Sequence, residues 1–249
     1  MVPLEGTLNF RDLGGYPAAG GVTRWGAVYR SDRLNELTDA DVAQLAALGL
    51  RTVCDFRYDR EVADDPSRLP EGARIVRLAV GSAPGDNPRN LEDLIRAGEI
   101  TQVTTASMAV GYLAMLENQA ALFGELIRLV GQDEHHAVVI HCTAGKDRTG
   151  LGAALLLGAV GVDEDVIIED YALTDEYRSV HRLAEIGPTI EAQGLSLDDL
   201  RVLFTAPAET MALTLGHVTE RWGGIEGYLT GPAGVTAEEI DALRAAWVE

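Results

Sequence analysis

AVVIHCTAGKDRTG, residues Ala137–Gly150, is the stretch of sequence that decides the fold. Its first four residues are apolar, which predicts a short buried strand. A glycine-containing loop follows, and the Ala- and Leu-rich run over residues 151–160 predicts a buried helix. In a strand–loop–helix unit, the loop N–H groups and the positive end of the helix dipole converge on one point. The stretch therefore predicts an anion-binding site.

The rest of the chain predicts the frame around this stretch. Charged, Pro-rich or Gly-rich segments predict loops over residues 57–70 and 81–90, and a helical pattern resumes at about residue 91. Apolar runs predict further strands over residues 27–30, 50–56 and 74–80. Capping residues and apolar periodicity predict helices over residues 38–49, 119–130, 163–171, 175–193, 197–204 and 207–222 and after Thr236.

Strands that alternate with helices predict a three-layer α/β fold, with a mainly parallel central sheet flanked by helices. We expect one domain over residues 1–249. Within it, we expect the helices of about residues 162–222 to form a lid-like extension over the site.

Composition excludes several classes of function. The formal net charge of −19 disfavours binding to nucleic acid and to anionic membranes. The two cysteines, Cys54 and Cys142, fit a reducing compartment and no disulfide framework. No apolar run approaches the roughly 18 residues of a membrane span, and the N-terminus lacks the pattern of a signal peptide. We therefore expect a cytoplasmic protein, or one exported without a recognisable signal peptide.

The residues of the central loop indicate chemistry on phosphate. A thiol at Cys142 and a guanidinium at Arg148 form a Cys-x5-Arg pattern. A helix N-terminus and nearby cations lower the pKa of a thiol from about 8.5 to roughly 3.5–7.5, which makes Cys142 a candidate nucleophile. The planar fork of Arg148 matches two phosphate oxygens. The loop residues expected around the phosphate are Thr143, Ala144, Gly145, Lys146, Asp147 and Arg148.

Other loop residues predict supporting roles. The Thr149 hydroxyl can donate to the Cys142 sulfur and ease its departure in the second step of the reaction. His141 is expected to orient the loop, because a thiolate needs no general base. Gly145 and Gly150 allow a close approach that a side chain would block.

Beyond these residues, HCTAGKDRTG resembles the signature loop of the protein tyrosine phosphatase superfamily, HCxxGxxR[ST]G. It is more similar to that of the atypical bacterial tyrosine/serine protein phosphatases, typified by mycobacterial protein tyrosine phosphatase B. The shared motifs include NFRDLGG at residues 9–15, YRS at 29–31 and D-x-R at 55–57. The resemblance implies the cysteine-phosphatase fold, a phosphocysteine intermediate, and no metal or other cofactor. It also implies that Cys142 is the nucleophile, that Arg148 is the phosphate clamp, and that the substrate is a phosphotyrosine protein or peptide, with phosphoserine and phosphothreonine as further substrates.

The general acid is left open between two named residues, with another carboxylate, or no strong acid, as the remaining alternatives. Many tyrosine phosphatases carry it about thirty residues before the cysteine, but residues 111–117 contain no Asp. Asp55 is favoured, because it ends a predicted strand whose carboxyl end meets the same sheet edge as the loop, and because of its family counterpart. Asp147, inside the loop, is the alternative.

The remaining polar residues each have two interpretations. Lys146 resembles the lysine in the loops of phosphoinositide phosphatases, which makes a phosphoinositide the alternative substrate; otherwise its ammonium faces solvent. Arg57 either lines the mouth of the site or pairs with Asp55. Asn9, Arg11, Asp12, Arg30 and Asp32 form a scaffold under the loop or recognise substrate, with Arg11 the candidate phosphate contact. A phosphate-binding module without turnover is disfavoured, because both the cysteine and the arginine of the loop are present. Nothing in the sequence indicates an oligomeric state.

Overall fold

A computed structural model describes residues 1–81, 94, 95 and 97–249. Its main sheet has five strands in the order β1-β4-β7-β5-β6, of which the last four are parallel and β1 is antiparallel to β4. The strands are β1 (Arg11–Asp12), β4 (Val28–Ser31), β5 (Thr52–Asp55), β6 (Arg74–Arg77) and β7 (Val138–His141), and a separate hairpin pairs β2 (Pro17–Ala18) with β3 (Gly21–Val22). The predicted mainly parallel sheet is confirmed.

The central strand β7 places the loop at the middle of the sheet edge. His141 is in register with Ser31 of β4 on one side and with Asp55 of β5 on the other. Asp55 is in register in turn with Arg77 of β6. Residues from segments far apart in the chain therefore surround the point where the loop begins.

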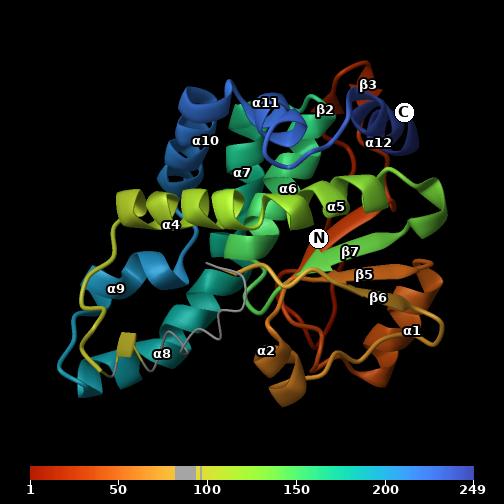
Figure 1. Ribbon diagram of the computed structural model, residues 1–249. Coiled ribbons are helices and arrows are strands. Elements are labelled where there is room, and N and C mark those ends of the chain that lie inside the picture. The colour runs from red at the N-terminus through yellow and green to blue at the C-terminus, as the bar shows by residue number, and fades with distance from the viewer. Residues whose placement is uncertain (82–93, 96) are drawn as a thin grey trace.

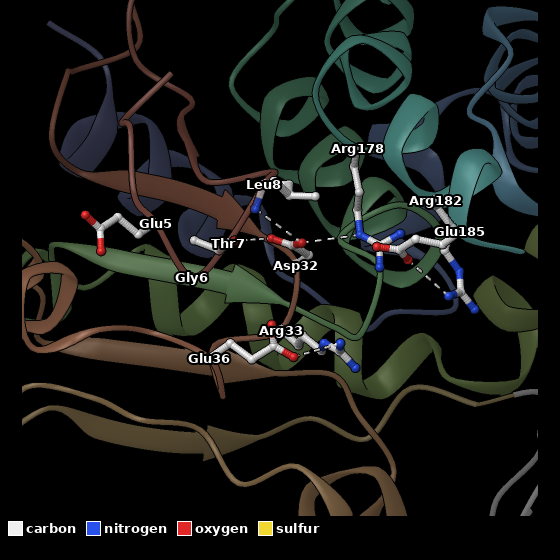
Figure 2. A pocket seen from close by; sticks show the side chains of 10 residues that line it. All are labelled: Glu5, Gly6, Thr7, Leu8, Asp32, Arg33, Glu36, Arg178, Arg182 and Glu185. Carbon is white, nitrogen blue, oxygen red and sulfur yellow. Dashed lines mark hydrogen bonds and ion pairs between the residues drawn. The ribbon is translucent and has the colours of Figure 1, made fainter.

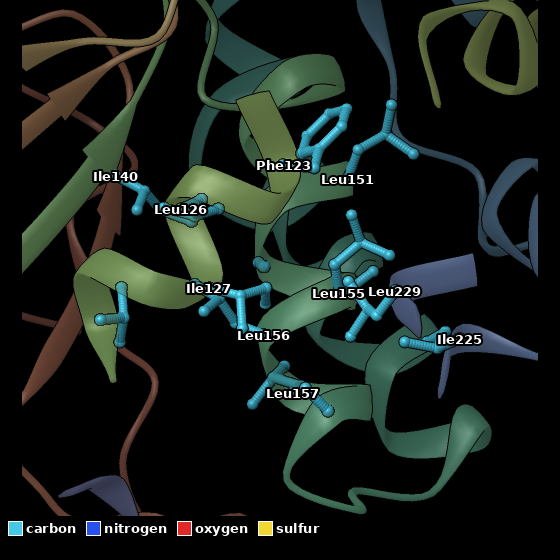
Figure 3. Packing of buried hydrophobic residues seen from close by; sticks show 14 of the residues in the cluster. Phe123, Leu126, Ile127, Ile140, Leu151, Leu155, Leu156, Leu157, Ile225 and Leu229 are labelled. Atoms are coloured by element: carbon cyan, nitrogen blue, oxygen red, sulfur yellow. The ribbon is translucent and has the colours of Figure 1, made fainter. Parts of the chain in front are cut away.

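Helices cover both faces of the sheet (Figure 1). Alternation along β7 separates the two faces. Val138 and Ile140 belong to the larger apolar cluster, and Val139 belongs to a smaller one with Leu45 of α1. Figure 3 shows part of the larger cluster, in which Leu126 of α5 lies beside Ile140 of β7. The helices are α1 (Asp39–Ala47), α2 (Asp59–Asp64), α4 (Thr105–Asn118), α5 (Ala120–Val130), α6 (Asp147–Ala159), α7 (Glu164–Thr174), α8 (Val180–Ala192), α9 (Leu197–Phe204), α10 (Ala208–Trp222), α11 (Ile225–Thr230) and α12 (Ala237–Trp247), with a 3₁₀ turn η1 (Asp133–His135) and a π-helical turn η2 (Asp175–Ser179).

Most predicted helices are present, with two differences that affect the site. The helix after the loop begins at Asp147 rather than near residue 151, so the last loop residues form its first turn. The segment over residues 57–70, predicted as mostly loop, contains α2, whose first turn is stabilised because Glu61 accepts a hydrogen bond from the backbone N–H of Tyr58. The predicted loop over residues 82–90 and the start of the helical pattern at residues 91–93 lie outside the described residues.

The region with the predicted lid has an apolar cluster of its own. Ile186 and Ile190 of α8 pack with Leu200 and Phe204 of α9, and Ile95 belongs to the same cluster. The predicted helix over residues 175–193 is present as η2 followed directly by α8. Within the described part of the chain, none of the helices combines the length and the apolar character that crossing a membrane requires.

Candidate active site

The loop between β7 and α6 makes an unusually close contact with the neighbouring strand. Gly145 has a φ of +65°, and a Cβ built on it would lie 2.6 Å from both the Ser31 carbonyl oxygen and the Asp32 backbone nitrogen. No larger residue fits there without moving the backbone. Cys142, at the start of the loop, is 1% exposed.

Two buried side chains from the N-terminal region support the loop from below. The Gly145 carbonyl accepts a hydrogen bond from Asn9 Nδ2 at 3.1 Å and another from Arg30 Nη2 at 2.8 Å. Arg30 also donates through Nη1 to Asp170 of α7, at 2.5 Å. The predicted supporting role of Asn9 matches this contact, and Arg30 and Asp170 extend the support to α7.

Arg11 has the contacts of a scaffold residue, one of its two interpretations, whereas Asp12 stabilises a turn. The guanidinium of Arg11, a candidate phosphate contact, is buried and donates to Asp170 (Nε to Oδ1, 3.2 Å), to the Asp170 carbonyl (2.8 Å) and to Asn9. It therefore belongs to the scaffold. The Asp12 carboxylate accepts from the backbone N–H groups of Gly14 and Gly26, each at 2.8 Å, so Asp12 stabilises a turn rather than the loop.

Arg148 pairs with a residue that the sequence analysis did not identify. Its Nη1 and Nη2 donate to the two carboxylate oxygens of Glu61 in α2, at 2.7 and 2.8 Å. Glu61 also accepts from the Thr143 hydroxyl in the loop. Burial opposes ionisation of Glu61, but the bonds from Arg148 outweigh it and lower the pKa of Glu61 to about 2. The signal in the sequence is weak: Glu61 stands three residues after the helix start, where a capping box has Glu or Gln, but Tyr58 is not the Ser or Thr with which such a box begins.

Arg148 is held as a cation beside the thiol. Its guanidinium carbon lies 5.1 Å from the centre of the Tyr58 ring. Burial lowers the pKa of Arg148, but the bonds to Glu61 and the charge of Cys142 raise it above the usual value. The Glu61 pair uses Nη1 and Nη2, so within the described residues the Nε–H of Arg148 makes no hydrogen bond to the protein.

Asp55, the favoured acid, is saturated with donors. Its Oδ1 accepts from the backbone N–H and the Nε of Arg57, both at 3.0 Å. Its Oδ2 accepts from Arg57 Nη2 and Arg77 Nη1, both at 2.9 Å. Burial opposes ionisation, but the Arg57 bonds outweigh it and hold the pKa of Asp55 below its usual value. Of the two interpretations of Arg57, these contacts support the pair with Asp55.

His141 lies between Asp55 and the loop. Its Nε2 is 3.6 Å from Asp55 Oδ1, and its Nδ1 is 3.3 Å from the Cys142 carbonyl. Burial lowers the pKa of His141 to about 4, so the ring is neutral at pH 7. A neutral ring within reach of the Cys142 backbone fits the predicted orienting role.

Asp147 has different partners from Asp55. Its Oδ1 accepts from Tyr112 Oη of α4 at 2.5 Å and lies 2.9 Å from Lys146 Nζ. Lys146 is 3% exposed, and its ammonium also approaches the Val202 carbonyl of α9 at 3.5 Å. The lysine therefore points into the protein, contrary to the interpretation that it faces solvent. Burial raises the pKa of Asp147, but Lys146 and Tyr112 outweigh it and lower the pKa below its usual value.

Thr149 and Gly150 follow Arg148 in the first turn of α6. The Thr149 hydroxyl is buried and has no hydrogen-bond partner within the described part of the protein. A Cβ on Gly150 would lie 2.9 Å from the ring of Tyr171, so this glycine admits the tyrosine. Among the residues that the structure describes, no group of three or more His, Cys, Asp or Glu side chains is placed to hold a metal ion.

A cavity of about 190 Å³ adjoins the loop on the side of the N-terminal segment (Figure 2). Arg33, whose backbone N–H donates to the Thr143 carbonyl at 3.2 Å, is part of its lining. Each arginine in the cavity faces a carboxylate: Arg33 pairs with Glu36, Arg178 with Asp32 and Arg182 with Glu185. Glu5 adds a fourth carboxylate to these three arginines, so the cavity lining carries no excess of positive charge.

Sequence comparisons agree with this geometry. A model of the tyrosine phosphatase family matches residues 2–249. The chain is 31% identical over 274 residues to the triple specificity protein phosphatase PtpB of Mycobacterium tuberculosis, covering 97% of this chain and 96% of that protein. It is 30% identical to a tyrosine-protein phosphatase of Nostoc commune, covering 88% of this chain and 73% of the relative.

Solved structures with similar folds are more distant. The catalytic core of Siw14 has a TM-score of 0.42 at 13% identity, covering 82% of this chain and 94% of that chain. TpbA of Pseudomonas aeruginosa, in complex with pTyr, has a TM-score of 0.40 at 16% identity, covering 93% of this chain and 94% of that chain.

Proposed function

Because this chain belongs to the tyrosine phosphatase family, we propose that it hydrolyses phosphotyrosine in proteins or peptides through a phosphocysteine on Cys142. The observation that carries the proposal is the loop itself. A thiol begins it, the charged guanidinium of Arg148 lies close enough to interact with that thiol, and the first turn of α6 adds its dipole.

 The guanidinium and the helix dipole supply the positive charge that a phosphate dianion needs, because the substrate has to be neutralised before an anion can attack it.

In the first step, the Cys142 thiolate attacks phosphorus in line with the bond to the tyrosine oxygen. The loop N–H groups and Arg148 bind the equatorial phosphate oxygens. Because the Glu61 pair uses Nη1 and Nη2 of Arg148, the Nε edge remains for phosphate. As the sulfur–phosphorus bond forms and the phosphorus–oxygen bond breaks, the leaving oxygen needs a proton.

We assign that proton to Asp147 rather than to Asp55. Four N–H donors from two arginines hold the Asp55 carboxylate, whose side chain is 3% exposed, and these donors favour its charged form. The Asp147 side chain is 27% exposed and belongs to the loop residues. A bound phosphate dianion raises the pKa of a neighbouring carboxyl, so substrate binding favours the protonated form of Asp147.

In the second step, water attacks the phosphocysteine and the thiolate leaves. Asp147, now ionised, accepts a proton from that water. The buried, unpartnered hydroxyl of Thr149 is available to donate to the departing sulfur. Release of inorganic phosphate then restores the thiolate.

The substrate class follows from the position of Lys146. A lysine that recognises a phosphoinositide headgroup has to reach the mouth of the site, but this ammonium is buried against Asp147 and α9. We therefore favour phosphopeptides over phosphoinositides. The name of one relative, triple specificity protein phosphatase, supports more than one class of phosphorylated substrate, and we propose phosphoserine and phosphothreonine beside phosphotyrosine.

The helices over about residues 162–222 are proposed to act as a lid over the thiol. The support for this proposal is that Lys146 reaches the Val202 carbonyl of α9, which links the loop to this region. If Cys142 reacts with hydrogen peroxide as fast as an exposed thiol of low pKa, the lid proposal is wrong.

The test of the function is phosphate release from a phosphotyrosine peptide in the presence of EDTA. Cys142→Ser is expected to abolish turnover, because a serine hydroxyl does not ionise as a thiol does. Cys54→Ala, which removes the buried thiol in β5, is the control and should retain activity. Turnover by Cys142→Ser equal to that of the wild type would overturn the mechanism, and higher turnover of a soluble phosphoinositide than of the peptide would overturn the substrate class.

A further inference from the structure

A line of three hydroxyl and carboxyl groups runs from α7 to the loop. Tyr171 Oη lies 2.8 Å from Tyr112 Oη, which lies 2.5 Å from Asp147 Oδ1. Tyr112 is completely buried and Tyr171 is 1% exposed. The two rings pack edge to face, with centroids 6.3 Å apart, so both hydroxyls have fixed positions.

The direction of each hydrogen bond follows from the number of protons. An ionised carboxylate only accepts, and a tyrosine hydroxyl has one proton to donate. Tyr112 must therefore donate to Asp147, and Tyr171 must donate to Tyr112. The space for this arrangement comes from Gly150, since any side chain there would collide with the Tyr171 ring.

The same oxygen of Asp147 receives a second donor. Lys146 Nζ lies 2.9 Å from Oδ1, so two donors converge on that atom. Among the described residues, Oδ2 has no hydrogen-bonding partner of its own. Oδ1 is thus fixed as an acceptor, and a proton arriving at Asp147 has its place on Oδ2.

We propose that Tyr112, held by Tyr171, is a positioning residue that orients Asp147 so that Oδ2 delivers the proton to the leaving oxygen. This inference rests on the proposed role of Asp147 as the general acid. When the phosphorus–oxygen bond breaks, the Oδ2 proton moves to the tyrosine oxygen. The negative charge left on the carboxylate is then stabilised at Oδ1 by the Tyr112 hydroxyl and the Lys146 ammonium.

Tyr112→Phe removes the hydroxyl and keeps the ring. We compare two substrates in each variant: phosphotyrosine, whose leaving group needs a proton, and 2,4-dinitrophenyl phosphate, whose leaving group is a far weaker base. A hydrogen bond to a charged group is worth roughly 1.5–3 kcal/mol, so we expect kcat on phosphotyrosine to fall about 10- to 100-fold. On the dinitrophenyl ester we expect a fall of less than about threefold, because little proton transfer is needed there.

Asp147→Asn and the double variant separate the inference from the proposed function. If Asp147 is the acid, Asp147→Asn lowers kcat on phosphotyrosine much more than kcat on the dinitrophenyl ester. Adding Tyr112→Phe then lowers kcat on phosphotyrosine almost no further, because both changes act on one proton transfer. If Asp147→Asn slows both substrates equally, the acid assignment fails. If Asp147→Asn is selective but Tyr112→Phe is not, or if the two losses multiply, the acid stands and the role of Tyr112 is wrong.

A matched control addresses folding. Tyr228→Phe removes another buried hydroxyl, which donates to the Leu116 carbonyl at 2.8 Å rather than to Asp147. It should cost similar stability and leave the ratio of the two substrates unchanged. Should Tyr112→Phe not fold, Tyr171→Phe decides the question: a selective loss on phosphotyrosine supports the positioning role, and an equal loss on both substrates, or no loss, overturns it.

Discussion

Asp55 ends the strand beside the loop and Asp147 belongs to the loop itself, and both have a pKa held below the usual value, but their surroundings differ in kind. The oxygens of Asp55 accept four N–H groups from Arg57 and Arg77. Asp147 has one tyrosine hydroxyl and one ammonium, both on a single oxygen. The pKa shifts of the two carboxylates have the same direction and so do not tell which one is the acid. The oxygen that has no donor, Oδ2 of Asp147 among the described residues, does distinguish them.

The two carboxylates also differ in what their loss should change. Removing one partner of a buried ion pair leaves an uncompensated charge in the protein interior. Asp55 should therefore act mainly on stability. Asp147, whose side chain is more exposed, should act mainly on turnover.

The pH–rate profiles of Asp147→Asn and Asp55→Asn should give the largest effect. We expect Asp147→Asn to lower kcat on phosphotyrosine by about 10²- to 10⁴-fold and to remove the basic limb of the profile. Asp55→Asn should keep that limb in the folded fraction, which circular dichroism measures. Loss of the basic limb in Asp55→Asn alone would reverse the assignment.

Arg57→Met tests the other side of the comparison. The variant leaves the buried Asp55 carboxylate without its main partner, so we expect the free energy of unfolding to fall by about 3–5 kcal/mol in urea denaturation. Arg60→Met is the control, because Arg60 pairs with Asp64 on the surface, with both side chains more than half exposed. An exposed pair of this kind contributes about 0.3–0.5 kcal/mol. Equal losses in the two variants would show that the Asp55 cluster does not stabilise the fold.

Glu61→Gln tests the partner of the clamp. An amide can accept only one of the two Arg148 donors, so the guanidinium should lose its fixed orientation. We expect KM for a phosphotyrosine peptide to rise about tenfold, in line with about 1.5 kcal/mol for a hydrogen bond to a charged group. Glu71→Gln, a change to a carboxylate in the turn before β6, should leave KM unchanged. A lower KM in Glu61→Gln would instead show that Glu61 competes with phosphate for Arg148.

His141 provides the smallest effect, measured as the pH dependence of stability. Its pKa is about 4 in the folded protein, below the ordinary value of 6.5, so the unfolded chain binds more protons between these values. Its contribution to stability is fully present above pH 6.5 and is lost as the pH falls towards 4, at up to about 1.4 kcal/mol per pH unit. His141→Gln should flatten this slope and leave the contribution of His136, whose pKa burial also lowers. An unchanged slope would contradict a neutral, buried His141.

The sequence predicted the fold well because the relevant signals are local. The apolar run over residues 137–140 and the run after the loop predicted β7 and α6, and both are present. Alternation of strands with helices predicted the parallel sheet, which places Asp55 beside His141. These signals depend on neighbours in the chain, so no tertiary contact was needed to recognise them.

The site was predicted only in part, because its contacts join distant segments. Glu61 reaches Arg148 across 87 positions, and Tyr112 reaches Asp147 across 35. Nothing in the sequence near either residue indicates such a partner. The sequence likewise showed Arg57 beside Asp55 but not Arg77, which arrives from the neighbouring strand and completes the cluster.

The support under Gly145 has a consequence for protein synthesis. Asn9 leaves the ribosome 136 positions before Gly145, a delay of about 7–27 s at typical rates of elongation. Asp170, which holds Arg11 and Arg30 in place, emerges later still. A nascent chain that ends before α7 thus carries Cys142, Asn9 and Arg30 but not Asp170, so we expect the loop to gain its full support only when α7 has been made.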